Sequence, residues 1–278
     1  MIIMPDTILL FKNGQTCSLQ KDYNVDTLEL AVDPPKKESQ KIKINGRYGV
    51  HNYNKSYTER GCQLRVAVNT IDIEGVYEKR NELYALFGRL DDFYIIYSRE
   101  PGIRRRVEYE DMSINRQPGF LMFEIIIKFS IPDGFGESIF TSLDKKEWDT
   151  NKFAWGMGVE WDDNYNYIFT DKRFNFKNIG TMEINPAQHD ITWRIKCDPR
   201  YLKITNFTTN DSLTIYNPSA VSQGIIVIKG LHIEDEYGRN LVRHADAGEI
   251  HLVPDINQIK IESSSFHWCE VNTRFYYL

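Results

Sequence analysis

Apolar and polar residues alternate with a period of two along most of this chain. From 64 to 68, and again from 120 to 129, every second side chain is apolar, and Glu124 and Lys128 fall on the polar side of the longer run. Each run predicts a strand with one face on a core, because successive side chains of a strand point to opposite faces. The segment 93–97, FYIIY, is apolar on both faces and predicts a covered strand. Pro101 and Gly102 then predict a turn into a hairpin partner.

One segment, 75–87, has helical periodicity instead. Val76, Leu83 and Phe87 form one apolar stripe, and the opposite side is polar. Asp72 is the nearest candidate for the N-cap. Gly88 is the residue type that favours a left-handed position after a helix C-terminus. A helix this short is marginal alone, so we expect it to dock on a sheet.

The last hundred residues alternate again, with turn residues between short runs and no helical segment. This spacing predicts a β-sandwich. Pro132, Gly134 and Gly136 interrupt the pattern earlier. We therefore expect a mainly β chain in three parts: an N-terminal domain at 1–138, a connecting segment at 139–171, and a C-terminal sandwich at 172–278.

Composition narrows the classes of function. The chain has 34 basic and 39 acidic residues, a net charge of −5, which argues against a general nucleic-acid binder. Its four cysteines show no CxxC spacing, so we expect buried, reduced thiols. The first residues lack the basic region of a signal peptide, and the longest apolar run is too short to cross a bilayer. We expect synthesis in the cytoplasm and no membrane partner.

No motif indicates catalysis, a cofactor or a metal. The six histidines form no HxH or HExxH pattern; they are His51, His189, His232, His244, His251 and His267. Asp162, Asn164 and Asn166 imitate half of a calcium loop, but Tyr167 and Arg173 stand where glycine and glutamate are needed. GxSxG and P-loop signatures are missing. We therefore predict that the chain is not an enzyme, although a wall-degrading activity through paired carboxylates stays open.

The remaining candidates are surfaces. Arg104, Arg105 and Arg106 form either a solvated hairpin edge that discourages strand pairing or a docking patch for an acidic neighbour. The polar segment 33–61, which contains Tyr48 and Tyr57, is a poor core and a good arm toward a neighbouring subunit. The aromatic residues of 148–169 predict packing or a subunit contact, with sugar stacking as the alternative.

Several stretches resemble one known family. Asn45–Gly49, Tyr57–Arg60, the LRVAV strand at 64–68, the helix that ends at Phe87 and the hairpin at Pro101 are similar to the N-terminal domain of phage distal tail (Dit) proteins. These are proteins of long-tailed phages that infect Gram-positive bacteria. Asn178–Glu183 with Pro186, Leu213–Asn217 and the terminal RFYYL resemble the family's C-terminal domain.

The resemblance implies a structural role at the virion tail tip, after assembly in the host cytoplasm. It implies a β-sandwich or split-barrel-like ring domain with one α-helix, and a galectin-like C-terminal β-sandwich. Dit proteins form a homo-hexamer between the tail tube protein and a tail-associated hub protein, and DNA passes through the ring without specific binding. Many also carry receptor-binding proteins.

One alternative is a binding module for host cell-wall carbohydrate. It would act through Trp193 or the tryptophans of 139–171. The galectin sugar-binding pattern is absent, and Trp155-Gly156 lies outside the predicted sandwich. We therefore do not carry lectin activity over from the resemblance.

Overall fold

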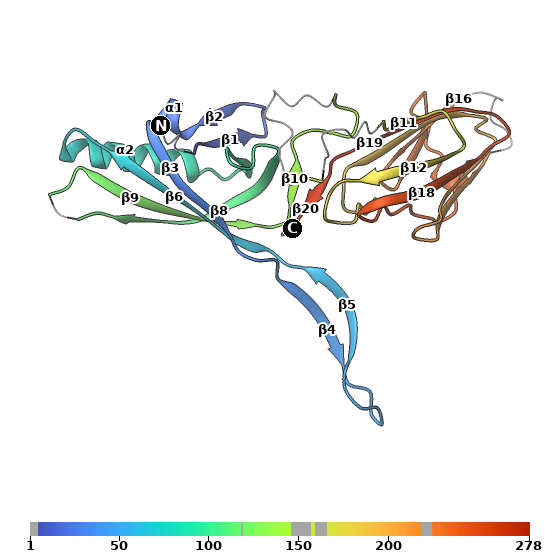
Figure 1. The fold of residues 1–278 in the computed structure, drawn as a ribbon, viewed down its shortest axis with the longest axis horizontal. Helices are drawn as coiled ribbons and strands as arrows, with labels where there is room; N and C mark the ends of the chain where they lie inside the picture. Colours follow the sequence, from blue (N-terminus) through green and yellow to red (C-terminus); the bar gives the residue numbers. More distant parts are fainter. Residues whose placement is uncertain (1–4, 118, 146–156, 159–165, 218–223) are drawn as a thin grey trace. The chain divides into compact units, whose positions relative to one another are not determined.

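The computed structural model describes residues 5–117, 119–145, 157–158, 166–217 and 224–278 (Figure 1). The chain divides into two compact units, residues 1–136 with Leu278 and residues 137–277. Strands dominate both units, which confirms the mainly β prediction. The domain boundaries expected at residues 138 and 171 stay predictions.

The first unit is built on an antiparallel sheet whose main path has the order β2-β1-β7-β8-β9-β6-β3. Apolar positions with period two point into its core, as at Leu64, Val66 and Val68, each at most 1% exposed. The covered strand FYIIY is β7, which pairs with β1 and β8, and the predicted hairpin at Pro101 joins β7 to β8. The strand bounds are β1 (Thr7–Phe11), β2 (Thr16–Ser18), β3 (Val25–Val32), β6 (Arg60–Asn69), β7 (Phe93–Tyr97), β8 (Ile103–Asn115) and β9 (Met122–Ile131).

Helix α2 (Ile73–Phe87) lies along this sheet (Figure 1). Its predicted stripe is buried at Val76, Leu83 and Phe87, and the predicted cap is confirmed, since the carboxylate of Asp72 accepts a hydrogen bond from the Gly75 amide at 2.7 Å. The prediction for Gly88 is wrong: its φ is −74°, because a right-handed turn with a 2.8 Å bond to the Tyr84 carbonyl ends the helix. A second, short helix, α1 (Leu19–Tyr23), was not predicted.

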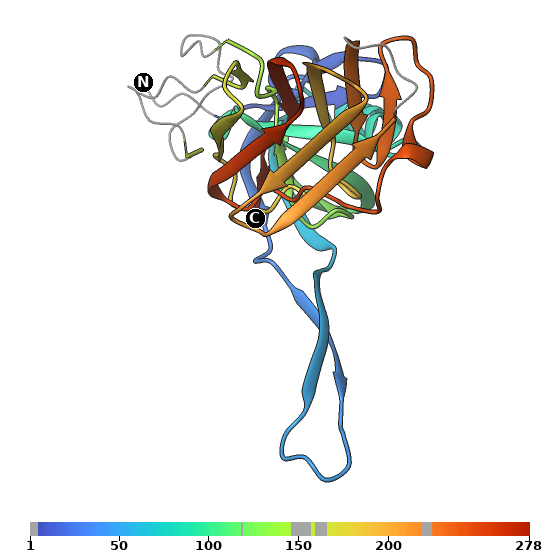
Figure 2. The same ribbon diagram turned by 90° about the vertical axis from the view of Figure 1, so that its right-hand side faces the viewer.

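Strands β4 (Lys37–Ile42) and β5 (His51–Tyr57) form a separate two-stranded sheet. They follow β3 and precede β6 directly in the chain. Figure 1 and Figure 2 show this hairpin, drawn in light blue, extending away from the sheet of the first unit. We call residues 34–59 the arm.

The second unit contains two sheets, with strand orders β11-β19-β13-β16-β17 and β12-β18-β14-β15. Each has one buried apolar face, which is the pattern of a sandwich, and no described α-helix lies in this unit. The bounds are β11 (Ile168–Phe169), β12 (Arg173–Asn178), β13 (Ile191–Cys197), β14 (Tyr201–Asn206), β15 (Asp211–Tyr216), β16 (Gly224–Lys229), β17 (His232–Asp235), the 3-10 helix η2 (Val242–His244), β18 (Asp255–Glu262) and β19 (Phe266–Thr273). Two further short strands, β10 (Gly136–Ser138) and β20 (Tyr276–Tyr277), belong to neither of these sheets and pair with each other.

The described residues of 139–171 belong to the second unit. Phe140 packs on Phe275 with ring centroids 6.0 Å apart, and Tyr167 packs on Phe176 at 5.1 Å. Strand β11 pairs with β19. These aromatic residues therefore pack as side chains of the fold. Trp148, Trp155 and Trp161 lie outside the described residues.

All four cysteines are unpaired thiols, as expected, and three are buried: Cys62, Cys197 and Cys269. Burial raises the pKa of Cys62 and of Cys197 to about 12, so these thiols are protonated and unreactive. In the described part of the chain, every helix is too short or too polar to cross a membrane.

Candidate interaction surfaces

The arm presents apolar side chains to solvent. Around its tip, Ile42, Ile44 and Val50 are about half exposed, and Tyr48 is fully exposed. Tyr57, 37% exposed, lies at the other end of the arm, where the ammonium of Lys37 stands 5.5 Å from its ring centroid. An exposed apolar tip on a polar hairpin is typical of a segment that buries itself against another molecule.

Polar contacts hold the base of the arm, where it joins β3 and β6; we call this base the root. Arg60 is 7% exposed, and its guanidinium donates to the carbonyls of Asp33 at 2.7 Å and Gly134 at 3.3 Å. Burial lowers the pKa of Arg60, and the nearby charge of Arg105 lowers it further. Gly134 has a φ of +71°, and a Cβ there would lie 2.5 Å from the Thr58 carbonyl. The root thus depends on one buried arginine and one glycine.

The structure separates the three arginines of β8. Arg105 shares the face of Ile95, its cross-strand partner, and donates to Glu100 at 2.6 Å. Arg104 and Arg106 point to the other face, where Arg104 lies 4.2 Å from the Tyr94 ring centroid. Two hydrogen bonds tie Arg106 to Asp133, at 2.8 and 2.7 Å, and raise its pKa.

Strand β8 pairs with β7 at the arginine run and with β9 only from Glu108 to Asn115, so a solvated edge at Arg104, Arg105 and Arg106 stays a prediction. The run forms no single patch, since its side chains divide between two faces of the sheet. A docking role for Arg104, Arg105 or Arg106, and for Tyr48 or Tyr57, stays a prediction.

Sequence reasoning missed a surface on the outer side of α2. Tyr77 and Tyr84 are about half exposed, and the Arg80 guanidinium lies 5.2 and 5.8 Å from their ring centroids. Such cation–π contacts hold the three side chains in place. Tyrosine and arginine are the residue types that dominate binding hot spots. The spacing i, i+3, i+7 was the signal for this surface, but it was overlooked beside the stronger buried stripe.

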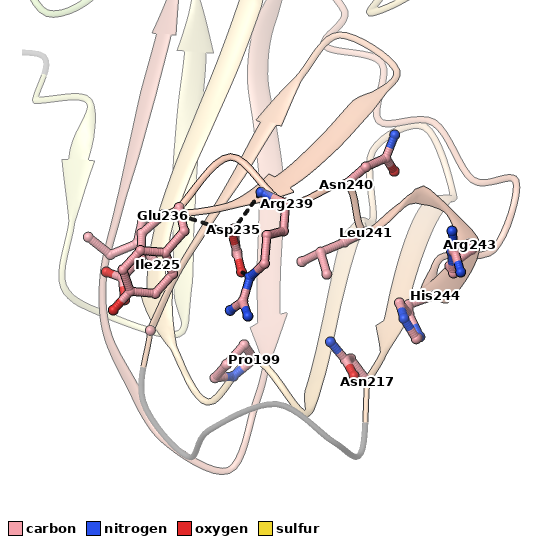
Figure 3. Close-up of a pocket in the computed structure, with 12 residues that line it drawn as sticks. Pro199, Asn217, Ile225, Asp235, Glu236, Arg239, Asn240, Leu241, Arg243 and His244 are labelled. Atoms are coloured by element: carbon pink, nitrogen blue, oxygen red, sulfur yellow. Dashed lines mark hydrogen bonds and ion pairs between the residues drawn. The ribbon is translucent and has the colours of Figure 1, made fainter.

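The second unit has a pocket of about 400 Å³ between the turn after β17 and η2 (Figure 3). Asp235 accepts hydrogen bonds from the Tyr237 and Arg239 amides, at 3.0 and 2.9 Å, and from the Arg239 guanidinium at 2.5 Å. The carboxylate therefore stabilises the turn and neutralises the arginine. His244 lies on the far side of the pocket in Figure 3. This arrangement gives no reason to assign a reaction.

The described residues contain no group of three or more histidine, cysteine or acidic side chains placed to hold a metal ion. Trp193 is 3% exposed and faces the core, which is incompatible with the hypothesis that it stacks on a sugar. Among the described residues, the surfaces best suited to contact another molecule are therefore the arm and the outer side of α2.

Comparisons with known proteins bear on the domain family and on the fold. Residues 13–131 match the family model of the phage tail protein RIFT-related domain. No curated protein matches the chain. Among solved structures, the crystal structure of the phage SPP1 Dit protein aligns with a TM-score of 0.66 at 15% identity, covering 98% of this chain and 99% of that one. Two structures of the phage P2 baseplate in its activated conformation, with Ca and with Sr, align at 11% and 12% identity over 98% of each chain, with TM-scores of 0.44 and 0.42.

The part of the first unit from 13 to 131 is thus similar to the phage tail protein RIFT-related domain. The chain as a whole has the fold of a phage distal tail protein, the family that its sequence resembles. Together the family model and the fold support a structural role in a phage tail.

Proposed function

We propose that this chain is the distal tail subunit of a long-tailed phage that infects Gram-positive bacteria. Six copies form a ring at the tail tip that joins the tail tube protein to a tail-associated hub protein. The observation that carries the proposal is the fold, which follows that of SPP1 Dit over 98% of the chain. The SPP1 protein is regarded as a paradigm of the hub adsorption apparatus in phages that infect Gram-positive bacteria.

The arm is the proposed ring contact. Subunits of a closed ring meet head to tail, so each needs two different and complementary surfaces. The exposed tip around Tyr48 supplies one surface that has no use within the subunit. The stripe Tyr77-Arg80-Tyr84 on α2 is a candidate for the second.

The other proposed properties follow from a position at the tail tip. DNA crosses the ring without specific binding, which agrees with a net charge of −5. The second unit carries receptor-binding proteins where the phage has them. The chain performs no reaction of its own.

Electron microscopy of the purified full chain, alone and with its tube and hub partners, tests the proposal. We expect six-fold rings. A chain that stays monomeric under every assembly condition, and ignores both partners, would contradict it.

Shortening the arm tests the contact itself. Replacing residues 36–58 by a three-residue glycine-rich turn removes the tip but keeps the root pair, in which the Asp33 amide donates to the Gly61 carbonyl at 2.9 Å. We expect a folded monomer with an unfolding midpoint close to that of the parent, because the removed strands pair only with each other among the described strands.

A pair of point variants, one on the arm and one at an equally exposed site outside it, provides a matched control. Tyr48→Ser should weaken the ring, whereas Leu90→Ser should not, since both side chains are fully exposed and only one lies on the arm. Rings that persist after removal of the arm would locate the contact elsewhere.

A further inference from the structure

The outward face of the sheet β12-β18-β14-β15 gathers more cations than carboxylates. Alternate residues of these strands are buried, so the others face solvent. The register places Arg173 of β12 opposite Lys260 of β18, and Lys203 of β14 opposite Glu262 of β18. Three cations on three strands therefore surround a single carboxylate.

These groups lie close enough to interact electrostatically. The hydrogen bond from Lys260 is the main cause that lowers the pKa of Glu262, and the charges of Lys203 and Arg173 lower it further. Lys260 pairs with Glu262, whereas Arg173 and Lys203 form no ion pair at 4.0 Å or less within the described residues. The face is thus locally positive on a chain with a net charge of −5.

The same face is hollowed twice, and Arg173 lines both hollows. One hollow is bounded by Asn175, Phe207 and Gln258, and the other by Tyr201 and Lys260. Exposed aromatic rings stand beside the cations: Phe207 is 52% exposed, Tyr201 39% and its cross-strand partner Tyr216 61%. We call the surface formed by Arg173, Lys203, Lys260, Glu262, Tyr201, Tyr216 and Phe207 the basic face.

We propose that the basic face binds an anionic polysaccharide whose charge is carried by phosphate groups. Guanidinium and ammonium groups donate charge-assisted hydrogen bonds to phosphate oxygens. The aromatic rings offer apolar platforms for the C–H faces of sugar rings, and their edges remain in water. Asn175 and Gln258, cross-strand partners, add amide donors and acceptors for hydroxyl groups.

The composition of the face favours this ligand over a protein. Lysine and glutamate are depleted at the centre of protein interfaces, and an apolar centre is normal there. Here Lys203, Lys260 and Glu262 occupy the middle strands, and the aromatic rings lie around them. A hydrated, charged polymer suits a polar centre of this kind. A nucleic acid is disfavoured, because three cations are few for a ligand that gains affinity from six to ten phosphate contacts.

The assignment of the polymer to the bacterial surface rests on the proposed function, because a tail tip would meet phosphate-bearing polysaccharide there. Binding itself does not rest on it. Ring formation and polymer binding are separate measurements, so the failure of one is distinguishable from the failure of the other.

Calorimetry or interferometry of the full chain with phosphomannan, with dephosphorylated mannan as the uncharged probe, tests the inference. We expect binding of phosphomannan at about 50 mM salt that weakens steeply as salt rises. Mannan should bind at least about tenfold more weakly, because the charge-assisted contacts are lost.

Two triple variants locate the site. Arg173→Gln, Lys203→Gln and Lys260→Gln together should weaken phosphomannan binding at least about tenfold and flatten its salt dependence. The matched control changes three exposed cations on the outer face of the other sheet, Arg194→Gln, Lys196→Gln and Lys229→Gln, with the same loss of charge. The control should stay within about twofold of the parent. Both variants should keep the parent unfolding midpoint.

Equal binding of phosphomannan and mannan, no binding of either, or equal losses in both triple variants would overturn the inference. A single-stranded oligonucleotide completes the test. If it binds more tightly than phosphomannan and the first triple variant abolishes this, the face is a nucleic-acid surface and the assigned ligand is wrong.

Discussion

Single residues show where sequence reasoning stops. The amides of Asn206 and Asn257 are fully buried and bonded to each other at 3.1 Å, and Arg60 is buried against two carbonyls. Polar side chains are mostly exposed, so a pattern of hydrophobicity assigns such residues to the surface. Their burial depends on backbone groups that distant segments bring to them. Period-two apolar positions such as Ile259 were predictable, because their neighbours in sequence decide the face.

Asp198 is expected to give the second unit an acid-sensitive step. Its carboxylate, 4% exposed, accepts from the Arg200 guanidinium at 2.9 Å and from the Ser264 hydroxyl at 2.5 Å, and these bonds hold its pKa well below the usual range. A depressed pKa contributes stability that is present above the unfolded value near 4 and is lost as pH falls toward the folded value. Stability should therefore decline below about pH 4.

Denaturant unfolding at several pH values measures this. Asp198→Asn should cost about 2 kcal/mol at neutral pH, as expected for lost bonds to a charged group, and should remove part of the decline below pH 4. Glu236→Gln, an exposed acid of the same unit, serves as the control. Parallel curves for Asp198→Asn and the parent protein would show that Asp198 does not carry the effect.

At the scale of elements, α2 was predictable because several signals agree along one segment. The stripe, the cap at Asp72 and the polar outer side all indicate the same helix, although Gly88 ends it by another geometry than expected. Helix α1 has only five residues, and its Ser18 cap was too weak a signal. The arm was expected as a poor core segment, yet nothing local indicated that it pairs with itself as β4 and β5.

The docking of α2 depends on a cluster of three phenylalanines. Phe87 of the helix lies 6.2 Å from Phe93 and 5.7 Å from Phe129, centroid to centroid, and each ring is at most 1% exposed. Phe87→Ala should lower the free energy of unfolding by about 3 to 5 kcal/mol through lost burial and the cavity that remains. Chemical denaturation measures the loss. Phe120→Ala, at a ring that is 60% exposed, should change it by less than about 1 kcal/mol.

At the scale of the whole molecule, each of the two units has the features of an independent domain. Each contains its own set of buried apolar residues. The presence of two β modules was predictable from two stretches of alternation separated by turn residues. It was harder to predict that the described residues of 139–171 belong to the second unit. Their partners are distant in the sequence: Phe140 packs on Phe275, and Tyr167 packs on Phe176.

The second unit is expected to fold alone. A fragment of residues 137–278 should unfold in one cooperative transition and give dispersed amide resonances, since a domain with its own core does not need the rest of the chain. The fragment 1–136 is the companion sample. A fragment 137–278 without a cooperative transition would show that its core is completed by the first unit.

The arm also has a mechanical consequence. Only Thr58 and Glu59 separate β5 from β6, and β6 is bonded to β9 along its whole length, from Arg60 opposite Ile131 to Asn69 opposite Met122. A force applied to the tip would pass along the backbone into β6 and act parallel to the strands. Many hydrogen bonds between β6 and β9 would then have to break together. Such a connection resists tension far better than a loop hinge, and it would transmit a load on the arm directly into β6 and β9 of the same subunit's sheet.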